Sequence, residues 1–327
     1  MGSLLQYYRH KRPFALEGGL VLDEFTIAYH TFGRRDGNNV VWVCHALTAN
    51  SNAEEWWSGL IGPGKVIDTD KYFVVCANIL GSCYGTEAAL FTGDTPALVT
   101  IRDMVRAHIL LREHLGVERI RLMMGGSMGG YQVLEWAFQE PEVALELFLI
   151  GTAASESAWG IAIHTAQRLA IEADPTWREG GEQGLKAARA IGMLTYRTYQ
   201  QFVMAQTGPP EHIQGFRAES YIRYQGEKLA RRFAARNYWL LTRSMDSHHI
   251  GRGRGADMET VLHGIRQRTL VMGIDSDLLC PFTEQKFLAQ HLPRARLIGI
   301  DSIYGHDGFL TESAKISGYL AEWLAGS

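Results

Sequence analysis

Short runs of consecutive apolar residues alternate with longer segments of helical periodicity in the first half of the chain. The runs show no apolar–polar alternation, which is typical of strands buried on both faces of a parallel sheet. We expect these strands at 40–46, 72–80, 119–126 and 144–154. Residues 100–116 have apolar side chains at helical spacing between Thr100 and Gly116, two residue types suited to cap a helix, and 127–139 predict a second helix. The alternation predicts a mostly parallel sheet with helices on both faces.

This alternation stops near residue 155 and resumes near residue 266. Further strands are then expected at 268–275 and 295–301, followed by an amphipathic helix over 308–326. The intervening segment has mainly helical patterns and is far longer than an ordinary connection. Because ligands bind at the carboxyl ends of parallel strands, a helical insertion there predicts a lid over a site. We therefore expect a core domain from 1–154 and 266–327 and a helical lid domain at 155–265.

Composition narrows the class of protein. The 327 residues are 46% hydrophobic and 20% charged with a formal net charge of −3, which is ordinary for a globular protein. The chain contains four cysteines without CxxC spacing and has no apolar run of about 18 residues. A GRGRG segment at 251–255 resembles nucleic-acid-binding repeats, but it is one short loop in an acidic chain. We expect a cytoplasmic protein that binds no metal, no nucleic acid and no membrane.

The segment Gly125–Gly129 has the pattern G-x-S-x-G between a predicted strand and a predicted helix. This pattern is typical of a nucleophile elbow, in which a sharp turn holds the serine in a strained, accessible conformation. The small residues on both sides allow the strand and the helix to approach each other. The alternative, a glycine-rich turn with an inactive serine, is less consistent with these flanking elements. We therefore expect Ser127 to be a nucleophile.

A serine nucleophile needs a base and an acid, which follow such an elbow in the chain order Ser, Asp or Glu, His. His306 is the only histidine after the last predicted strand, and it lies in a glycine-flanked loop. Two acids, Asp275 and Asp277, follow the preceding strand. We favour Asp277 because it lies farther along the loop, from where its carboxylate can turn toward His306. Asp307, next to the base, is expected either to be structural or to meet a cationic group of the substrate.

An oxyanion formed during acyl transfer needs two backbone donors. The elbow supplies the N–H of Met128, and the loop after the strand at 40–46 supplies the second, for which Leu47 is the natural candidate. His45 lies in the same loop, and its place before the elbow favours a role in shaping that loop over a catalytic role.

Ten ordered motifs along nearly the whole chain resemble the homoserine O-acetyltransferase family of the α/β-hydrolase superfamily. They include HALTANS, VTIRDMVRAH, GGSMGGYQVLEWA, MLTYRT, ESYIRYQGEKLARRF, GIDSDLLCP and YGHDGFL. The resemblance implies an α/β-hydrolase fold with a helical lid, and transfer of an acetyl group from acetyl-CoA to L-homoserine through an acyl-serine, in methionine synthesis. It implies acetyl-CoA as a co-substrate, no bound cofactor, and a homodimer formed through the lid helices.

Carried onto this chain, the resemblance implies that Ser127, Asp277 and His306 form the triad and that Leu47 and Met128 donate to the oxyanion. It also implies a set of residues that bind the substrate. Arg197 is expected to bind the carboxylate of the amino acid and Asp307 its ammonium group, and Arg223, Tyr224 and Asp246 are weaker candidates. Each of the latter could instead form a salt bridge within the lid.

The sequence departs from the family pattern in the short loop at Glu87, at Tyr131, and at Ala234 and Arg236. These departures leave open transfer of a succinyl group and an L-serine acceptor. Hydrolysis by the same triad, as in an esterase or deacetylase, is a further alternative. A binding protein without activity would be expected to have lost part of the triad, whereas all three members are present.

Overall fold

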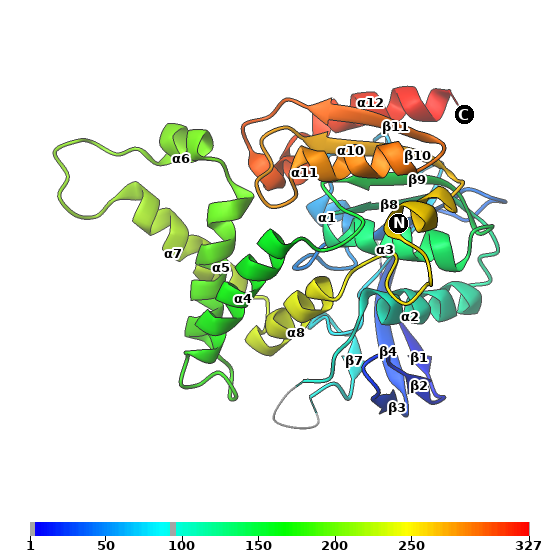
Figure 1. Cartoon of the computed structure of the whole chain (residues 1–327), viewed down its shortest axis with the longest axis horizontal. Helices are drawn as coiled ribbons and strands as arrows, with labels where there is room; N and C mark the ends of the chain where they lie inside the picture. The colour runs from blue at the N-terminus through cyan, green and yellow to red at the C-terminus, as the bar shows by residue number, and fades with distance from the viewer. Residues whose placement is uncertain (1–3, 92–95, 327) are drawn as a thin grey trace.

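The computed structural model describes residues 4–91 and 96–326, and a twisted sheet runs through its centre (Figure 1). In spatial order the strands are β1 (Leu5–His10), β4 (Phe25–Phe32), β6 (Phe73–Ala77), β5 (Val40–Cys44), β8 (Ile120–Gly126), β9 (Ala144–Ile150), β10 (Arg268–Ile274) and β11 (Ala295–Ile300). The neighbours from β6 to β11 pair in parallel, while β4 pairs antiparallel with both β1 and β6. The sequence prediction of a mostly parallel sheet is confirmed.

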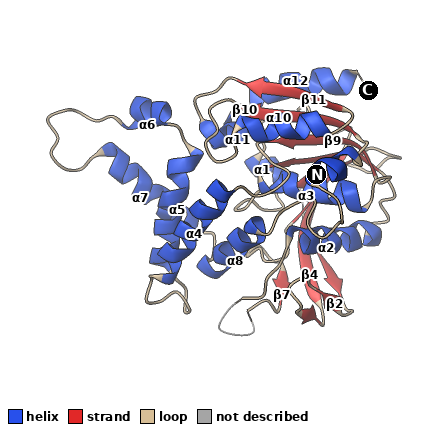
Figure 2. Ribbon diagram, in the orientation of Figure 1, coloured by secondary structure: helices blue, strands red, loops and turns tan. Residues whose placement is uncertain are grey.

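Helices cover both faces of the sheet (Figure 2). They are α1 (Ala53–Trp56), α2 (Ile101–His114), α3 (Met128–Gln139), α10 (Phe282–His291), α11 (Gly308–Thr311) and α12 (Ser313–Ala325). The buried side chains form two clusters, because successive residues of a strand point to opposite faces. Trp42 and Met123 pack with residues of α2, α3 and α10, whereas Val41 and Leu122 pack with residues of α12. Burial on both sides is why β5 has no polar residue.

The predicted helix after Thr100 forms as α2. Thr100 accepts from the Asp103 N–H, and the Asp103 carboxylate accepts from the Thr100 N–H, which completes a capping box. Gly116 follows the helix with a φ of 63°. The predicted C-terminal helix is wrong in one respect, because Glu312 separates α11 from α12 with a non-helical ψ of 38°.

Several elements were not predicted from the sequence. Besides β1 and β4, they include β7 (Glu87–Ala88), which pairs with β4, and a small hairpin of β2 (Phe14–Ala15) and β3 (Val21–Leu22). The short loop at Glu87 that departs from the family pattern contains β7, and its continuation at 92–95 lies outside the described residues.

The segment expected to be a lid contains α4 (Ala158–Glu172), α5 (Glu182–Tyr196), α6 (Tyr199–Gln206), α7 (Arg217–Ala230), α8 (Ala235–Asp246) and α9 (Met258–His263). Helices α4 to α7 project from the side of the sheet at which β8 leads into α3 (Figure 1). The chain leaves the core at 154–156 and returns beside that point at 248–250. The two stretches are hydrogen-bonded, because the Glu156 N–H donates to the His248 carbonyl and the Ile250 N–H donates to the Ala154 carbonyl.

Candidate active site

Ser127 lies at the turn between β8 and α3 with φ 54° and ψ −129°. Among the described residues it is the only non-glycine residue with a positive φ. Its N–H donates to the Ile150 carbonyl of the adjacent strand β9, 3.0 Å away, which holds the turn in place. A strained serine at this turn is the geometry of a nucleophile elbow.

The glycines around Ser127 are required by close packing. A Cβ at Gly125 would lie 2.4 Å from the Gly129 backbone, and a Cβ at Gly129 would lie 2.2 Å from the Cys44 carbonyl oxygen at the end of β5. Neither glycine has a positive φ. The glycines therefore allow α3 to begin directly against β8 and β5, which brings Ser127 next to the loop after β5.

The structure brings Ser127, His306 and Asp277 together. Asp277 follows β10, and His306 lies in a 3-10 turn after β11. The His306 Nδ1 is 2.6 Å from the Asp277 Oδ2, and its Nε2 is 2.9 Å from the Ser127 Oγ. With the proton on Nδ1, the imidazole donates to Asp277 and accepts from the Ser127 hydroxyl. This is the geometry of a nucleophile, a base and an orienting acid.

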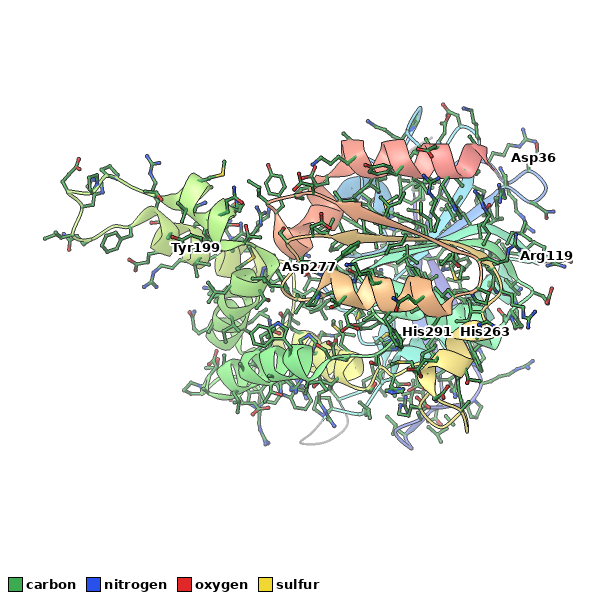
Figure 3. The ribbon with its side chains drawn as sticks, turned by 45° about the horizontal axis from the view of Figure 1, so that its top comes forward. Asp36, Arg119, Tyr199, His263, Asp277 and His291 are labelled. Carbon is green, nitrogen blue, oxygen red and sulfur yellow. The ribbon has the colours of Figure 1, made fainter. Side chains whose placement is uncertain are left out.

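The choice between the two acids is decided by hydrogen bonding. The second oxygen of Asp277, Oδ1, accepts from the N–H groups of Leu279 and Cys280, at 2.8 and 2.9 Å. These bonds fix the carboxylate so that Oδ2 points to His306. Asp275 is exposed and makes no hydrogen bond to His306. Figure 3 shows Asp277 on the side of the core that faces the lid helices.

His306 is buried, which by itself would lower its pKa, whereas the charge and the hydrogen bond of Asp277 raise it. Asp307 and Glu156 act in the same direction, so the net effect is a pKa above the ordinary histidine value. A base with a raised pKa holds the proton of the nucleophile more firmly during attack.

Leu47 lies in the loop after β5 and lines the same pocket as Ser127, while Met128 is the first residue of α3. Within the described part of the chain, no hydrogen bond engages the N–H of either residue. Gln132 of α3 anchors the loop, because its side-chain amide donates to the His45 carbonyl at 3.1 Å. The backbone donors are thus free to bind an oxyanion next to Ser127.

His45 shapes this loop. Its ring is fully buried, donates through Nδ1 to the Ala46 carbonyl at 2.8 Å and accepts through Nε2 from the Ile79 N–H at 3.2 Å. Burial lowers the pKa of His45 to about 4, so the ring is neutral at physiological pH and able to accept this bond.

A pocket of about 380 Å³ opens above Ser127 and His306. The core contributes the loop at 46–50, Trp56 and Phe309. The lid contributes His164 and Tyr196 together with three cations, Arg189, Lys228 and Arg232. A bound molecule in this pocket therefore contacts both the core and the lid.

Arg197 and Asp307, which were expected to bind opposite ends of a substrate, bind each other. The Arg197 Nε lies 2.5 Å from the Asp307 Oδ2, and both side chains are mostly buried, at 19% and 15% exposure. Asp307 lines the pocket of Ser127, whereas Arg197 is not among its lining residues.

Arg223 and Tyr224 are not brought to this pocket. Both lie on α7 and are exposed, and Arg223 pairs with Glu219 one turn away. Arg223 lines a separate groove of about 630 Å³ between α5 and α7. The expectation that these two residues line the site of Ser127 therefore does not match their position, because neither is among the residues that line its pocket.

Asp246 reaches the pocket only indirectly. It accepts from Nδ1 of His164, a lining residue, and pairs with Arg168, both at 2.7 Å. This is the lid salt bridge that the sequence left open as an alternative.

Two charged groups close to the site were missed from the sequence. Glu156 is half-buried at the start of the lid and accepts a 3.1 Å hydrogen bond from Tyr131, one turn after Ser127. Arg189 of α5 lines the pocket. The sequence around Arg189 indicates a helix but not which of its residues face a pocket. The sequence around Glu156 indicates only the end of a strand and the start of the lid segment.

Across residues 4–91 and 96–326, no cluster of histidine, cysteine and acidic side chains has the composition of a metal site. No helix in those residues is long and apolar enough to span a membrane.

Comparison with known proteins identifies the family of this chain. A family model described as the alpha/beta hydrolase fold matches residues 39–313. Homoserine O-acetyltransferases from Trichormus variabilis and Cyclobacterium marinum are each 44% identical to the chain, over 95% and 94% of its length and 91% of theirs. The chain belongs to the homoserine O-acetyltransferase family of the α/β-hydrolase fold.

Solved structures agree on the fold. A homoserine O-acetyltransferase from Staphylococcus aureus superposes with a TM-score of 0.85 at 28% identity, covering 99% of this chain and 95% of its own. Esterase E22 superposes with a TM-score of 0.88 at 20% identity, over 99% of this chain and 100% of its own. At that identity the esterase shows a shared fold and carries no information on the reaction.

Proposed function

We propose that the protein transfers the acetyl group of acetyl-CoA to the hydroxyl of L-homoserine, through an acyl-enzyme on Ser127. The 2.9 Å contact between the Ser127 Oγ and the His306 Nε2 supports this most directly, because it places an activated nucleophile in a pocket. The names of the relatives supply the acetyl group and the homoserine acceptor, and the family resemblance supplies acetyl-CoA as the donor. No resident cofactor is needed, and acetyl-CoA serves as a co-substrate.

In the first half-reaction, His306 takes the proton of Ser127 as its Oγ attacks the carbonyl carbon of the thioester. The N–H groups of Leu47 and Met128 bind the resulting oxyanion. The carbon–sulfur bond then breaks, the acetyl group stays on Ser127, and the proton on His306 passes to the departing thiolate. Asp277 holds the imidazole in the required tautomer and stabilises its charged form.

In the second half-reaction, His306 takes the proton of the homoserine hydroxyl, and that oxygen attacks the acetyl carbon. The bond to the Ser127 Oγ breaks and the oxygen regains the proton. Transfer competes with hydrolysis, so the alcohol has to be held in place while water is excluded. The segment at 155–265 supports this as a lid domain over the core, because its residues line the pocket together with Ser127.

Asp307 is the proposed partner of the ammonium group of homoserine. It lines the pocket next to His306, and its bond to Arg197 holds the carboxylate in position. A substrate ammonium would share this carboxylate with Arg197.

The family resemblance also supports a proposal on the pathway, the cellular location and the oligomeric state. We propose a cytoplasmic enzyme of methionine biosynthesis that acts as a homodimer. The dimer is supported by exposed apolar side chains around α6, where Tyr199, Met204 and Ile213 are 83%, 69% and 90% exposed. Sedimentation of the wild type and of Tyr199→Asp tests it, since a dimer formed through α6 is expected to dissociate in the variant.

The deciding experiment measures release of free thiol from acetyl-CoA with and without L-homoserine, together with the acetylated product. We expect sustained release only with homoserine. Release at the same rate without it would identify a hydrolase instead. Repeating the assay with succinyl-CoA and with L-serine, and comparing kcat/KM, tests the two alternative substrates.

Ser127→Ala is the matched control for the chemistry. Acetyl transfer is expected to fall by about 10⁴-fold or more, and mass spectrometry of the protein after brief exposure to acetyl-CoA is expected to show an acetyl adduct only on the wild type. Normal transfer by the variant would exclude an acyl-serine.

A further inference from the structure

The direction of the Leu47 N–H is set by the peptide bond that it shares with Ala46. The Ala46 carbonyl accepts from the His45 Nδ1 at 2.8 Å and from the Ala49 N–H at 3.0 Å. In a planar trans peptide the C=O and the N–H point in opposite directions. The two bonds to the carbonyl therefore orient the proposed oxyanion donor, and its position depends on what holds residues 45–51, here called the oxyanion loop.

Asn78 holds the far end of the oxyanion loop. It lies directly after β6, is 1% exposed, and its side-chain oxygen accepts from the Ser51 N–H at 2.9 Å. Its Nδ2 donates to the Ser51 Oγ at 3.0 Å and to the Tyr84 carbonyl at 2.7 Å. Asn78 thus joins the end of the oxyanion loop to the segment that contains Tyr84.

Arg232 of the lid reaches the middle of the oxyanion loop. It follows the C-terminal cap of α7 and lines the pocket of the proposed nucleophile. Its Nη1 donates to the Thr48 carbonyl and to the Tyr84 Oη, both at 2.5 Å. This guanidinium therefore bridges the residue after Leu47 and the segment that Asn78 holds.

The lid packs closely against the segment that contains Tyr84. The Asn237 side chain of α8 donates to the Gly81 carbonyl at 2.7 Å, and a Cβ on Gly81 would lie 2.6 Å from the Leu240 Cδ2. Phe233, the residue after the bridging arginine, is buried, and its ring meets the Tyr84 ring edge-on with centroids 5.7 Å apart. These contacts fix the guanidinium relative to the core.

We propose that Arg232 is a positioning residue that couples the lid to the oxyanion hole, because by holding the Thr48 carbonyl it keeps the Leu47 N–H directed at the oxyanion. This rests on the proposed function, since it assumes an acyl-enzyme on Ser127. An oxyanion forms when Ser127 is acetylated and again when the acetyl group leaves, and the same two donors bind it each time. Loss of the contact should therefore slow both half-reactions by the same factor, which loss of a residue that binds only one substrate would not do.

The test follows three reactions of the wild type and of Arg232→Gln by rapid mixing. They are the burst of free thiol from acetyl-CoA, the burst of p-nitrophenol from p-nitrophenyl acetate, and the decay of the isolated acetyl-enzyme with L-homoserine. We expect the maximal rate constants of all three to fall by a similar factor, about 10–30-fold, which is less than the loss of an oxyanion donor itself. The acetyl-CoA concentration at half-maximal rate should change by less than about threefold. Arg232→Lys keeps a charged donor and should recover part of the lost rate.

Arg231→Gln is the matched control, because this neighbouring guanidinium is 75% exposed and pairs with Glu227 at 3.9 Å. It should stay within about twofold of the wild type in all three reactions. Tyr84→Phe removes one acceptor of Arg232 and tests the same bridge where Arg232→Gln folds poorly, with an expected loss of about threefold. In the double variant it should add less than about twofold to the loss of Arg232→Gln, because both changes break one bridge.

The proposal would be overturned by rates within twofold of the wild type in Arg232→Gln, or by losses that multiply in the double variant. A loss confined to acetyl-CoA would also overturn it and would assign Arg232 to the acyl donor, since p-nitrophenyl acetate carries the acetyl group without CoA. A loss confined to the decay with homoserine would assign Arg232 to the acceptor. Failure of the proposed function is distinct, because the wild type would then form an acetyl-enzyme without transferring the acetyl group to homoserine.

Discussion

The first turn of α3 is packed so closely against β5 that a Cβ on Gly129 would lie 2.2 Å from the Cys44 carbonyl oxygen. This contact joins the two elements that carry the proposed oxyanion donors, since Met128 precedes Gly129 and Leu47 follows β5 by a short loop. The spacing of the two donors therefore depends on the absence of a side chain at one residue.

Gly129→Ala is expected to separate α3 from β5. Backbone cannot move aside as a flexible side chain can, so the free energy of unfolding should fall by about 1–3 kcal/mol and kcat by more than tenfold. Urea unfolding and steady-state kinetics measure the two effects. Gly318→Ala is the matched control, because no other group lies within 4 Å of the position that a Cβ would occupy at this exposed helical glycine. It should raise stability by up to about 1 kcal/mol, and an equal effect of both changes would contradict the role of packing.

Asp277→Asn is expected to reduce kcat by about 10³–10⁴-fold, because the amide no longer holds His306 in the required tautomer. Burial lowers the pKa of His306, and Asp277 is the main group that raises it, so that together with Asp307 and Glu156 the net pKa is above the ordinary value. Since the base acts in its neutral form, the acid limb of the pH profile of kcat/KM should move to lower pH in the variant. Asp275→Asn is the control and should stay within about threefold of the wild type. An unchanged profile in Asp277→Asn would assign the acid elsewhere.

Glu156→Gln is expected to change how stability depends on pH. Burial raises the pKa of the Glu156 carboxyl, so above its ordinary pKa the folded state binds more protons than the unfolded state. The free energy of unfolding then falls as pH rises through the raised pKa. Removing the titrating group should abolish this loss, so the variant should gain on the wild type as the pH rises above the ordinary carboxyl pKa. Parallel thermal-unfolding curves across this range would show that Glu156 does not titrate there, and Glu219→Gln on the exposed face of α7 provides the flat reference.

Arg254→Gln is expected to loosen the end of the lid segment. Its guanidinium pairs with Glu135 of α3, which is 1% exposed, and lies over the Phe138 ring at 3.8 Å. Arg102 remains bound to Glu135 at 3.0 Å, so the expected loss in the free energy of unfolding is about 2 kcal/mol, less than for a fully orphaned buried charge. The exposed Arg223→Gln should cost less than about 0.5 kcal/mol. Equal losses in urea unfolding would argue against a structural role for the GRGRG loop.

The sequence alone predicted those helices and turns that are stabilised by contacts between residues close in the chain. The capping box at Thr100 and Asp103 lies within one helical turn, and the strand–turn–helix around Ser127 is fixed by residues close in the chain. The chain order of Ser127, Asp277 and His306 followed from the order of the strands. The strand β1 was missed because its residues alternate between exposed and half-buried positions, and its hydrogen bonds come from β4, which is distant in sequence.

Which charged side chains form ion pairs with each other was decided by the tertiary structure alone. Arg197 and Asp307 lie 110 residues apart and become each other's partners only when the lid helix α5 meets the turn after β11, whereas Arg189, two turns earlier on the same helix, is left facing the pocket. Arg223 and Tyr224 belong to a motif that resembles the family closely, yet they are exposed on α7 and do not line the pocket of Ser127. The sequence by itself determined that this protein has a serine nucleophile, a base and an acid on one α/β core, because local pattern and strand order carry that information. Which charges meet in the pocket depends on distances between segments far apart in the chain, and these exist only in the folded protein.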